Sequence, residues 1–247
     1  MAYQRVHIII NPASGQNETI LNTLNEVFNS HGITWDVSIT QQVGDGTRYA
    51  QEAVANGCDL VMAYGGDGTV LDVANGLIGG DVPLGILPGG TANAMANEMN
   101  IPNRLWDAAQ LVCDPASAIR SIDVGVAGER NFLLRVGSGM IAKLSVSREL
   151  KDRFGIGAYL IAGVQALTTP QFVQYQITID GETHATTGTA CLVTNGTSIG
   201  ALGLHLSKKI KIDDGLLDVY VLNNDLPTAL GMAGCGGRPA AKALRRW

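Results

Sequence analysis

The stretch Leu60-Val61-Met62-Ala63-Tyr64-Gly65-Gly66-Asp67-Gly68-Thr69 places a glycine-rich turn directly after an apolar run. The run 60–64 has the length and composition of a buried β-strand, and the apolar spacing over 70–77 predicts a helix after the turn. Glycines let main-chain N–H groups approach an anion without hindrance from a Cβ atom, and a helix N-terminus favours negative charge. The stretch therefore predicts a phosphate-binding turn between a strand and a helix.

The acidic residue in this turn points to a metal ion. Asp67 would repel a phosphate unless a cation lies between the two, so its position argues for Mg²⁺ bridging to a nucleotide. Thr69 can cap the helix or donate to a phosphate. The structural alternative is a plain strand-to-helix turn in which Asp67 is the N-cap of the helix.

Two further polar turns follow apolar runs in the same half of the chain. Asn11-Pro12-Ala13-Ser14-Gly15 comes after the run 6–10, and Pro88-Gly89-Gly90-Thr91-Ala92-Asn93 comes after the run 83–87. Because the carboxyl ends of parallel strands meet at one edge of a sheet, the three turns are expected to line one crevice. Neither GxxxxGK[ST] nor GxGxxG occurs at these turns, so a nucleotide site of another kind is expected.

The order of the patterns predicts two domains and a tail. In residues 1–121, strands alternate with helices, which is typical of an α/β domain with a parallel sheet. The expected strands are 6–10, 35–40, 60–64 and 83–87, and the expected helices are 18–29, 47–56, 70–77 and 92–99. Residues 122–222 predict an antiparallel β domain with one helix within 140–167. Its expected strands are 122–126, 132–136, 174–179, 189–194 and 217–222. Residues 223–247 are expected to be a Gly-rich basic tail without a strand.

Composition narrows the classes of function. The chain is 46% hydrophobic and 16% charged, which favours a globular fold over disorder. The formal net charge of −5 argues against nucleic acid as a partner. The four cysteines form no metal-ligand spacing, and no apolar run approaches the ~18 residues that span a bilayer. We expect a cytoplasmic protein with free thiols that would meet any lipid substrate at a membrane surface.

A second copy of four letters of the central motif, Gly44-Asp45-Gly46-Thr47, precedes an ordinary helix. It is interpreted as a turn with an N-cap. The four histidines are isolated from any nucleophile or metal-ligand spacing, and they are expected to be structural or exposed.

In their order and spacing, the three turns resemble those of the diacylglycerol kinase catalytic family, which includes bacterial lipid kinases and sphingosine kinases. Ile122-Asp123-Val124-Gly125 and the stretch 211–219 are similar to that family's second domain, so the resemblance covers residues 5–222. It implies an NAD kinase-like α/β domain, a C-terminal β-sandwich, and an ATP site in the cleft between them. The implied reaction transfers the γ-phosphate of Mg-ATP to the hydroxyl of diacylglycerol or a similar lipid.

The resemblance also implies individual roles. ATP would be held by Asn11, Pro12, Ala13, Ser14, Gly15, Thr40, Gly65, Gly66, Asp67, Gly68, Thr69, Val70, Leu71, Asp72, Gly90, Thr91 and Asn93. Asp67 would lie nearest the catalytic Mg²⁺. A structural Mg²⁺ would be bound by the side chain of Asp214 and by the carbonyl oxygens of Lys211 and Leu216. From the residues alone, Asp213-Asp214-Gly215 favours a hairpin turn between two strands over a metal site.

Three departures from the family pattern bear on activity. Asp72 stands where the family often has Glu, and Ala94 stands where many members have Asp. The late Asp-Gly-Glu motif, whose acidic residue is the family's general base on the lipid hydroxyl, does not follow Leu222. Asp180-Gly181-Glu182 has these letters but lies earlier, where it predicts a hairpin turn. A base adds ~10²- to 10⁴-fold to the rate, so nucleotide binding could survive without it.

These departures leave alternatives open. One hypothesis is that the β domain is incomplete at its C-terminal end, so that the chain is truncated or altered relative to an active ancestor and is a silent nucleotide- or lipid-binding homologue. Another is an NAD kinase, because that superfamily shares the central turn and the pair Asn97-Glu98 occurs here. Homodimerisation and contact of the segment 143–153 or the basic tail with anionic lipid are also left open.

Overall fold

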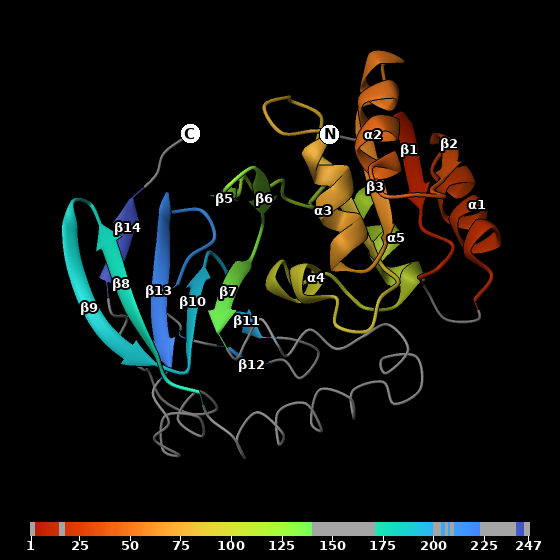
Figure 1. Ribbon diagram of the computed structural model, residues 1–247. Coiled ribbons are helices and arrows are strands. Elements are labelled where there is room, and N and C mark those ends of the chain that lie inside the picture. The colour runs from red at the N-terminus through yellow and green to blue at the C-terminus, as the bar shows by residue number, and fades with distance from the viewer. Residues whose placement is uncertain are drawn as a thin grey trace. The chain divides into compact units, whose positions relative to one another are not determined.

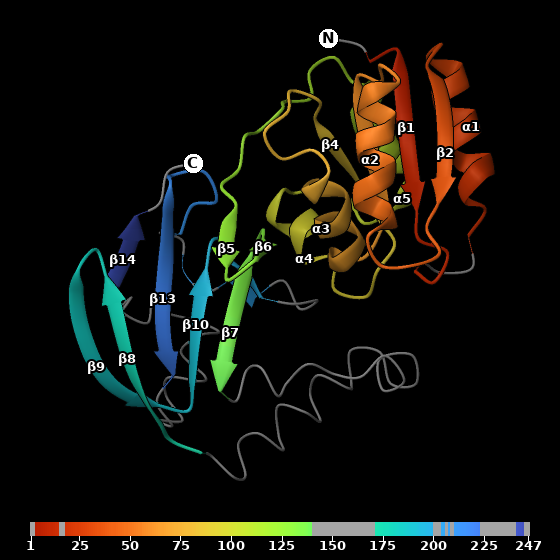
Figure 2. The same ribbon diagram turned by 45° about the horizontal axis from the view of Figure 1, so that its top comes forward.

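The computed structural model describes residues 3–14, 18–139, 171–199, 204–205, 207, 210–222 and 241–244. The chain divides into two units, Met1–Arg120 and Ser121–Trp247, and Figures 1 and 2 show the elements of each. The elements of the first unit are β1 Arg5–Ile10, α1 Ile20–Ser30, β2 Thr34–Ile39, α2 Asp45–Ala55, β3 Leu60–Gly65, α3 Asp67–Asn75, β4 Leu84–Pro88, α4 Ala94–Glu98 and α5 Leu105–Cys113.

The four strands of the first unit form one parallel sheet in the order β2-β1-β3-β4. This confirms the predicted α/β domain and its four strands. All six residues of β3 are buried, as expected for a central strand covered by helices on both faces. On one face, Ile8 and Met62 pack with Phe28 of α1 and Ala109 of α5 in a single apolar cluster. The other face is covered by α2 and α3, which contact β1 and β3.

Two helical predictions in this unit need correction. Helix α3 begins at Asp67 rather than at residue 70, because Gly66 alone provides the extended N-cap, with φ −88° and ψ −176°. Most of the central glycine-rich motif is therefore the first turn of a helix. Helix α5, which was not predicted, follows the third polar turn and buries Leu105, Ala108 and Ala109 beside α1.

The second unit is antiparallel, as predicted. Its elements are β5 Gly125–Ala127, β6 Arg130–Phe132, β7 Arg135–Gly139, β8 Val173–Ile179, β9 Glu182–Gly188, β10 Ala190–Thr194, β11 Ser198–Ile199, β12 Leu204–His205, β13 Leu216–Leu222 and β14 Ala241–Leu244. The largest sheet has the order β14-β13-β10-β7, and β5-β6, β8-β9 and β11-β12 form antiparallel pairs. The two-residue turn Asp180-Gly181 joins β8 to β9 with positive φ at both residues, which confirms the predicted hairpin.

Several strand predictions in the second unit are wrong in detail. The expected strand 132–136 is divided between β6 and β7. The strand is interrupted at Leu133 and Leu134, because their carbonyls accept side-chain hydrogen bonds from Asn195 and Thr194, respectively. The expected strand 122–126 begins only at Gly125. The segment interpreted as a tail contains β14, which pairs with β13. The helix expected within 140–167 lies outside the described residues.

No helix in the described part of the chain is both long enough and apolar enough to cross a bilayer.

Candidate active site

The strand register aligns the three polar turns at one edge of the first unit's sheet. Ile10, the last residue of β1, lies opposite Tyr64 of β3 and Ile39 of β2, and Gly65 lies opposite Pro88 at the end of β4. The segments that follow these strands therefore leave the sheet at the same edge. This is the edge where open parallel sheets bind their ligands.

The first turn is joined to the central motif by a side-chain hydrogen bond. Asn11 donates from Nδ2 to Thr69 Oγ1 at 3.0 Å, and its Oδ1 accepts the main-chain N–H of Ala13 at 3.0 Å. The N–H of Ser14 donates to the Asn11 carbonyl at 3.0 Å. Thr69 is only 8% exposed, so its hydroxyl is held between the helix and the first turn. Asn11 thus fixes the spacing of two of the three turns.

The third turn is joined to the central motif through main-chain contacts. Gly89 donates from its N–H to the Gly65 carbonyl at 2.9 Å, and Gly90 donates to Asn93 Oδ1 at 2.8 Å. A Cβ atom on Gly90 would lie 2.5 Å from the Cα of Gly66, so the two backbones touch without room for a side chain. Asn93 adopts the left-handed conformation, with φ +45°, as the N-cap of α4.

Asp67 caps a neighbouring helix rather than its own. Its Oδ1 accepts the main-chain N–H of Met95, in the first turn of α4, at 2.9 Å, whereas α3 has no side-chain cap. The interpretation of Asp67 as a plain N-cap of the following helix is therefore wrong. The second oxygen, Oδ2, has no protein partner among the described residues, so it is free to meet a cation at the edge where the turns converge.

The available donor set fits Mg²⁺ rather than a fully protein-coordinated metal. The described residues contain no cluster of three or more His, Cys, Asp or Glu side chains that could hold a metal ion. Magnesium commonly takes one or two protein carboxylates and completes its shell with water and substrate phosphates. A single free oxygen on Asp67 matches that preference.

Two residues that were not predicted from the sequence, Tyr64 and Glu18, support the turns. Tyr64 is fully buried, its carbonyl accepts the Asn11 N–H, and its hydroxyl donates to Glu18 Oε1 at 2.6 Å. Burial, together with the Glu18 carboxylate, raises the pKa of Tyr64 well above its usual value. A Cβ on Gly89 would lie 3.0 Å from the Tyr64 ring. A tyrosine that ends an otherwise apolar strand is a signal that its hydroxyl has a partner.

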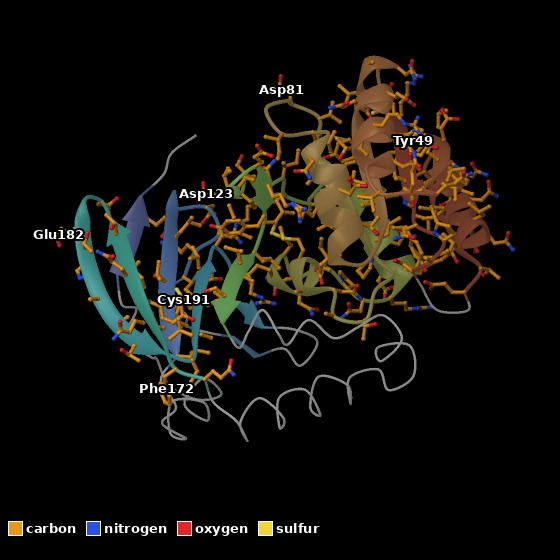
Figure 3. The ribbon with its side chains drawn as sticks, in the orientation of Figure 1. Tyr49, Asp81, Asp123, Phe172, Glu182 and Cys191 are labelled. Atoms are coloured by element: carbon orange, nitrogen blue, oxygen red, sulfur yellow. The ribbon has the colours of Figure 1, made fainter. Side chains whose placement is uncertain are left out.

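The turn expected to hold a structural metal lies in the second unit, and Figure 3 labels the aspartate that supports it, Asp123. Asp123 Oδ2 accepts the N–H of Gly215 at 2.5 Å, its own N–H donates to the Ile212 carbonyl at 2.8 Å, and Asp214 Oδ1 accepts the N–H of Leu216 at 3.1 Å. The hairpin interpretation is wrong, because the strand that follows, β13, pairs with β10 and β14. Lys211 and Asp214 therefore belong to one turn that Asp123 braces, and Leu216 begins the strand β13 directly after it.

Comparisons with known proteins cover both units of the chain. Residues 5–127 match the diacylglycerol kinase catalytic domain, and residues 135–230 match the YegS C-terminal NAD kinase beta sandwich-like domain. The chain is 31% identical over 226 residues to a protein of Bacillus subtilis strain 168 named "Diacylglycerol kinase", covering 89% of this chain and 74% of that protein. The chain belongs to the diacylglycerol kinase catalytic-domain family.

Other members of the family extend the comparison. A Pseudomonas putida protein named "Probable lipid kinase YegS-like" is 31% identical over 90% of this chain and 75% of its own length. The crystal structure of a diacylglycerol kinase from Bacillus anthracis superposes with a TM-score of 0.76 at 28% identity, covering 94% of this chain and 77% of that one. The chain spans 53% of a 32% identical, uncharacterised Synechocystis protein. Family membership places this chain among the lipid kinases, which are phosphotransferase enzymes.

The other residues that the family resemblance assigned to ATP binding differ in their burial and in their hydrogen bonds. The N–H of Thr40 donates to the Ile10 carbonyl at 2.9 Å, beside the first turn. Val70 is buried in the core of the unit, and its N–H donates to the Gly66 carbonyl within the helix. Pro12, Ala13 and Thr91 are exposed on the turns, and Leu71 and Asp72 are partly buried. Gly15 lies outside the described residues.

The motif Gly44–Thr47 forms the N-cap and first turn of α2, which confirms its interpretation as a turn with an N-cap. Gly44 is the N-cap, with φ +90°, and makes no side-chain cap bond. Asp45 is 4% exposed and accepts the N–H groups of Gln41 at 2.9 Å and Gln42 at 3.1 Å. These bonds, above all that from Gln41, and the guanidinium of Arg48 lower the pKa of Asp45 to about 2.

The lowered pKa of Asp45 predicts a loss of stability in acid. A carboxylate with a depressed pKa in the folded state stabilises the fold fully above its unfolded pKa of about 3.9, and this contribution disappears as the pH falls toward about 2. We expect Asp45→Asn to unfold at lower urea concentration than the wild type at pH 7, with the difference shrinking between pH 4 and pH 2.

Urea titrations at several pH values test this, with Asp81→Asn as the control. Asp81 is exposed in the segment between α3 and β4 and points to solvent in Figure 3. A difference between Asp45→Asn and the wild type that stays constant across the acid range would show that ionisation of Asp45 does not stabilise the fold.

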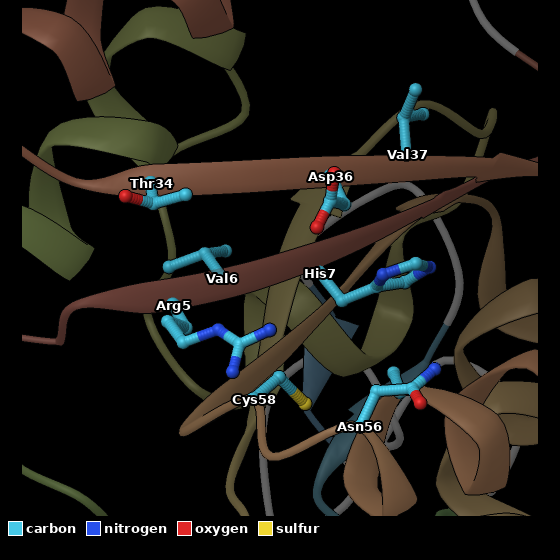
Figure 4. A pocket seen from close by; sticks show the side chains of 9 residues that line it. Arg5, Val6, His7, Thr34, Asp36, Val37, Asn56 and Cys58 are labelled. Atoms are coloured by element: carbon cyan, nitrogen blue, oxygen red, sulfur yellow. The ribbon is translucent and has the colours of Figure 1, made fainter.

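A cavity of about 320 Å³ lies away from the three turns. Its lining comes from the beginnings of β1 and β2 and the end of α2, and includes Arg5, His7, Asp36 and Cys58 (Figure 4). Burial lowers the pKa of His7, although nearby Asp36 opposes the shift, and the His7 ring contacts Ser38 Oγ at 2.9 Å. No residue predicted to bind ATP lines this cavity, so it is separate from the candidate active site.

Proposed function

We propose that this chain binds Mg-ATP at the three turns of the first unit and transfers the γ-phosphate to the hydroxyl of diacylglycerol or a similar lipid. The observation that carries the proposal is the junction of the turns. Asn11 contacts Thr69, Gly90 contacts Gly66, and Asp67 contacts Met95, so all three turns are held in one rigid arrangement. Family membership supports a lipid kinase.

In this proposal the phosphates meet the beginning of α3. The first hydrogen bond within the helix runs from the Val70 N–H to the Gly66 carbonyl, which leaves the N–H groups of Asp67, Gly68 and Thr69 without intrahelical partners. Such N–H groups and the positive end of the helix dipole bind phosphate oxygens. The glycines at 65, 66 and 90 permit close approach, and Asn11–Gly15, Thr40, Val70, Leu71, Thr91 and Asn93 complete the proposed nucleotide contacts.

Asp67 has two separate roles in the proposed site. Its Oδ1 holds α4 through Met95, and its Oδ2 would be a ligand of the Mg²⁺ that accompanies the nucleotide. When bound, Mg²⁺ would neutralise the charge that develops on the transferred phosphoryl group. Because Oδ1 is anchored by the Met95 N–H, the orientation of the carboxylate, and with it of Oδ2, is restrained before the substrate arrives.

A second Mg²⁺ is proposed for the turn of the other unit. The side chain of Asp214 and the carbonyl oxygens of Lys211 and Leu216 would bind it, in the turn that Asp123 braces through the Gly215 N–H. This ion would stabilise the turn and take no part in the transfer. The lipid acceptor lies in a membrane, so we place the reaction in the cytoplasm at the inner membrane surface.

Transfer of labelled γ-phosphate tests the proposed reaction. The full chain would be incubated with Mg-ATP and either detergent micelles containing diacylglycerol or NAD in solution. We expect labelled product that extracts into organic solvent with the micelles and none on NAD. Label on NAD would establish the alternative acceptor. ATP binding without transfer to diacylglycerol or to a mixed lipid extract would contradict a kinase and support a silent homologue.

A further inference from the structure

The N-terminus of α2 binds the carboxylate of Asp72, which belongs to α3. Asp72 Oδ2 accepts the main-chain N–H of Gly46 at 2.9 Å, and Asp72 Oδ1 accepts the hydroxyl of Thr47 at 2.8 Å. The same hydroxyl lies 2.7 Å from the Asp72 carbonyl oxygen. Both oxygens of the Asp72 carboxylate are therefore bound to the first turn of α2, where the helix dipole also favours a negative charge.

The backbones of the two helices are adapted to this contact. A Cβ on Gly46 would lie 2.6 Å from Asp72 Oδ2, so any other residue there would push the carboxylate away. At the end of α3, a Cβ on Gly76 would overlap the Thr47 carbonyl oxygen and lie 2.7 Å from the Cβ of Ala50. Gly46 in α2 and Gly76 at the end of α3 thus permit the two helices to approach each other closely.

The contact joins two segments that carry proposed nucleotide residues. On one side, Asp45 of α2 holds the N–H groups of Gln41 and Gln42, which follow Thr40. On the other side, α3 begins with Asp67. A displacement of α2 relative to α3 would therefore move the Thr40 segment relative to Asp67.

We propose that Asp72 is a positioning residue, which sets the Thr40 segment against the beginning of α3 through Gly46 and Thr47 and does not touch the nucleotide. This inference rests on the proposed function, because it assigns a role within that nucleotide site. It differs from the direct ATP contact that the family resemblance implied for Asp72. A carboxylate with both oxygens already bound would have to break two charge-assisted hydrogen bonds to reach a ligand.

A double-mutant cycle between Asp72 and Thr47 separates the two roles. We expect Asp72→Ala and Thr47→Val each to weaken Mg-ATP binding about tenfold in calorimetry, which is the scale of one hydrogen bond to a charged group. The double variant should bind no more weakly than the weaker single variant, because both changes break the same contact. Thr47→Ser retains the hydroxyl and should bind within about twofold of wild type. In turnover, KM for ATP should rise while kcat changes less.

The cycle also has an outcome that overturns the inference. If Asp72→Ala weakens binding while Thr47→Val leaves it unchanged, or if the two losses multiply, Asp72 acts on the nucleotide directly. Urea unfolding of each variant, compared with Asp81→Ala as a matched loss of one carboxylate, identifies any variant that fails to fold.

Amide exchange measured by NMR tests the inference without any nucleotide. We expect Asp72→Ala and Thr47→Val to accelerate exchange at Gln41 and Gln42, and Asp81→Ala to leave it unchanged. Unchanged exchange at both glutamines in the first two variants would overturn the positioning role. Failure of the wild type to bind Mg-ATP would contradict the proposed function alone, since the exchange rates still report on the contact.

Discussion

Replacing Asp67 with asparagine is expected to lower the rate of phosphoryl transfer by about 10²- to 10³-fold, the loss typical of removing one group that stabilises transition-state charge. The amide oxygen of asparagine can still accept the Met95 N–H, which lies 2.9 Å from Asp67 Oδ1. The amide nitrogen then replaces Oδ2, and an amide nitrogen does not bind Mg²⁺. The fold should therefore remain while the metal-dependent step is lost.

Initial rates of transfer over a range of Mg²⁺ concentrations measure this effect. Asp81→Asn makes the same chemical change at an exposed position and should keep the wild-type rate. Asp67→Ala supplies a second comparison, since it also removes the cap of α4 and should cost about 0.5–2 kcal/mol of stability that Asp67→Asn retains. More than a tenth of the wild-type rate in Asp67→Asn would show that Asp67 is not a metal ligand in the reaction.

Gly90→Ala is expected to destabilise the fold and to weaken nucleotide binding at the same time. The added Cβ would lie 2.5 Å from the Cα of Gly66 and 2.9 Å from Asn93 Oδ1, so the two turns must separate. Overpacking of this kind costs about 1–3 kcal/mol. The separation should also weaken Mg-ATP binding, because the proposed phosphate contacts lie on both turns.

Urea unfolding and calorimetry with Mg-ATP measure the two effects of Gly90→Ala. Gly80→Ala is the control, because its Cβ would lie 3.4 Å from the Leu77 carbonyl oxygen, at the distance of an ordinary contact. Equal unfolding midpoints for Gly90→Ala and the wild type would mean that the close approach of the two turns is not required by the fold.

The sequence predicted the first unit well because its strands are continuous apolar runs, each followed by glycine or polar residues. Ile8 and Met62 are buried in runs whose length and flanking turns distinguish strand from helix. The parallel arrangement then places the ends of β1, β3 and β4 together. The convergence of Asn11, Asp67 and Gly90 at one edge follows from these two facts.

What the sequence could not predict depends on contacts between distant residues. Asp67 binds the N–H of Met95, 28 residues away, and no local pattern indicates that partner. Asp72 was assigned to nucleotide binding by the family resemblance, and no local pattern indicates that Gly46 and Thr47, about 25 residues earlier, bind its carboxylate. The strand break at Leu133 and Leu134 similarly depends on Thr194 and Asn195, some 60 residues later.

Binding of Mg-ATP to the full chain, measured by calorimetry together with amide exchange, tests the central claim most directly. We expect one site whose affinity falls when Mg²⁺ is removed, with amides protected within residues 11–15, 66–71 and 89–93 and at Thr40. Binding that does not depend on Mg²⁺, or protection confined to the cavity beside Arg5 and His7, would contradict a nucleotide site at the three turns.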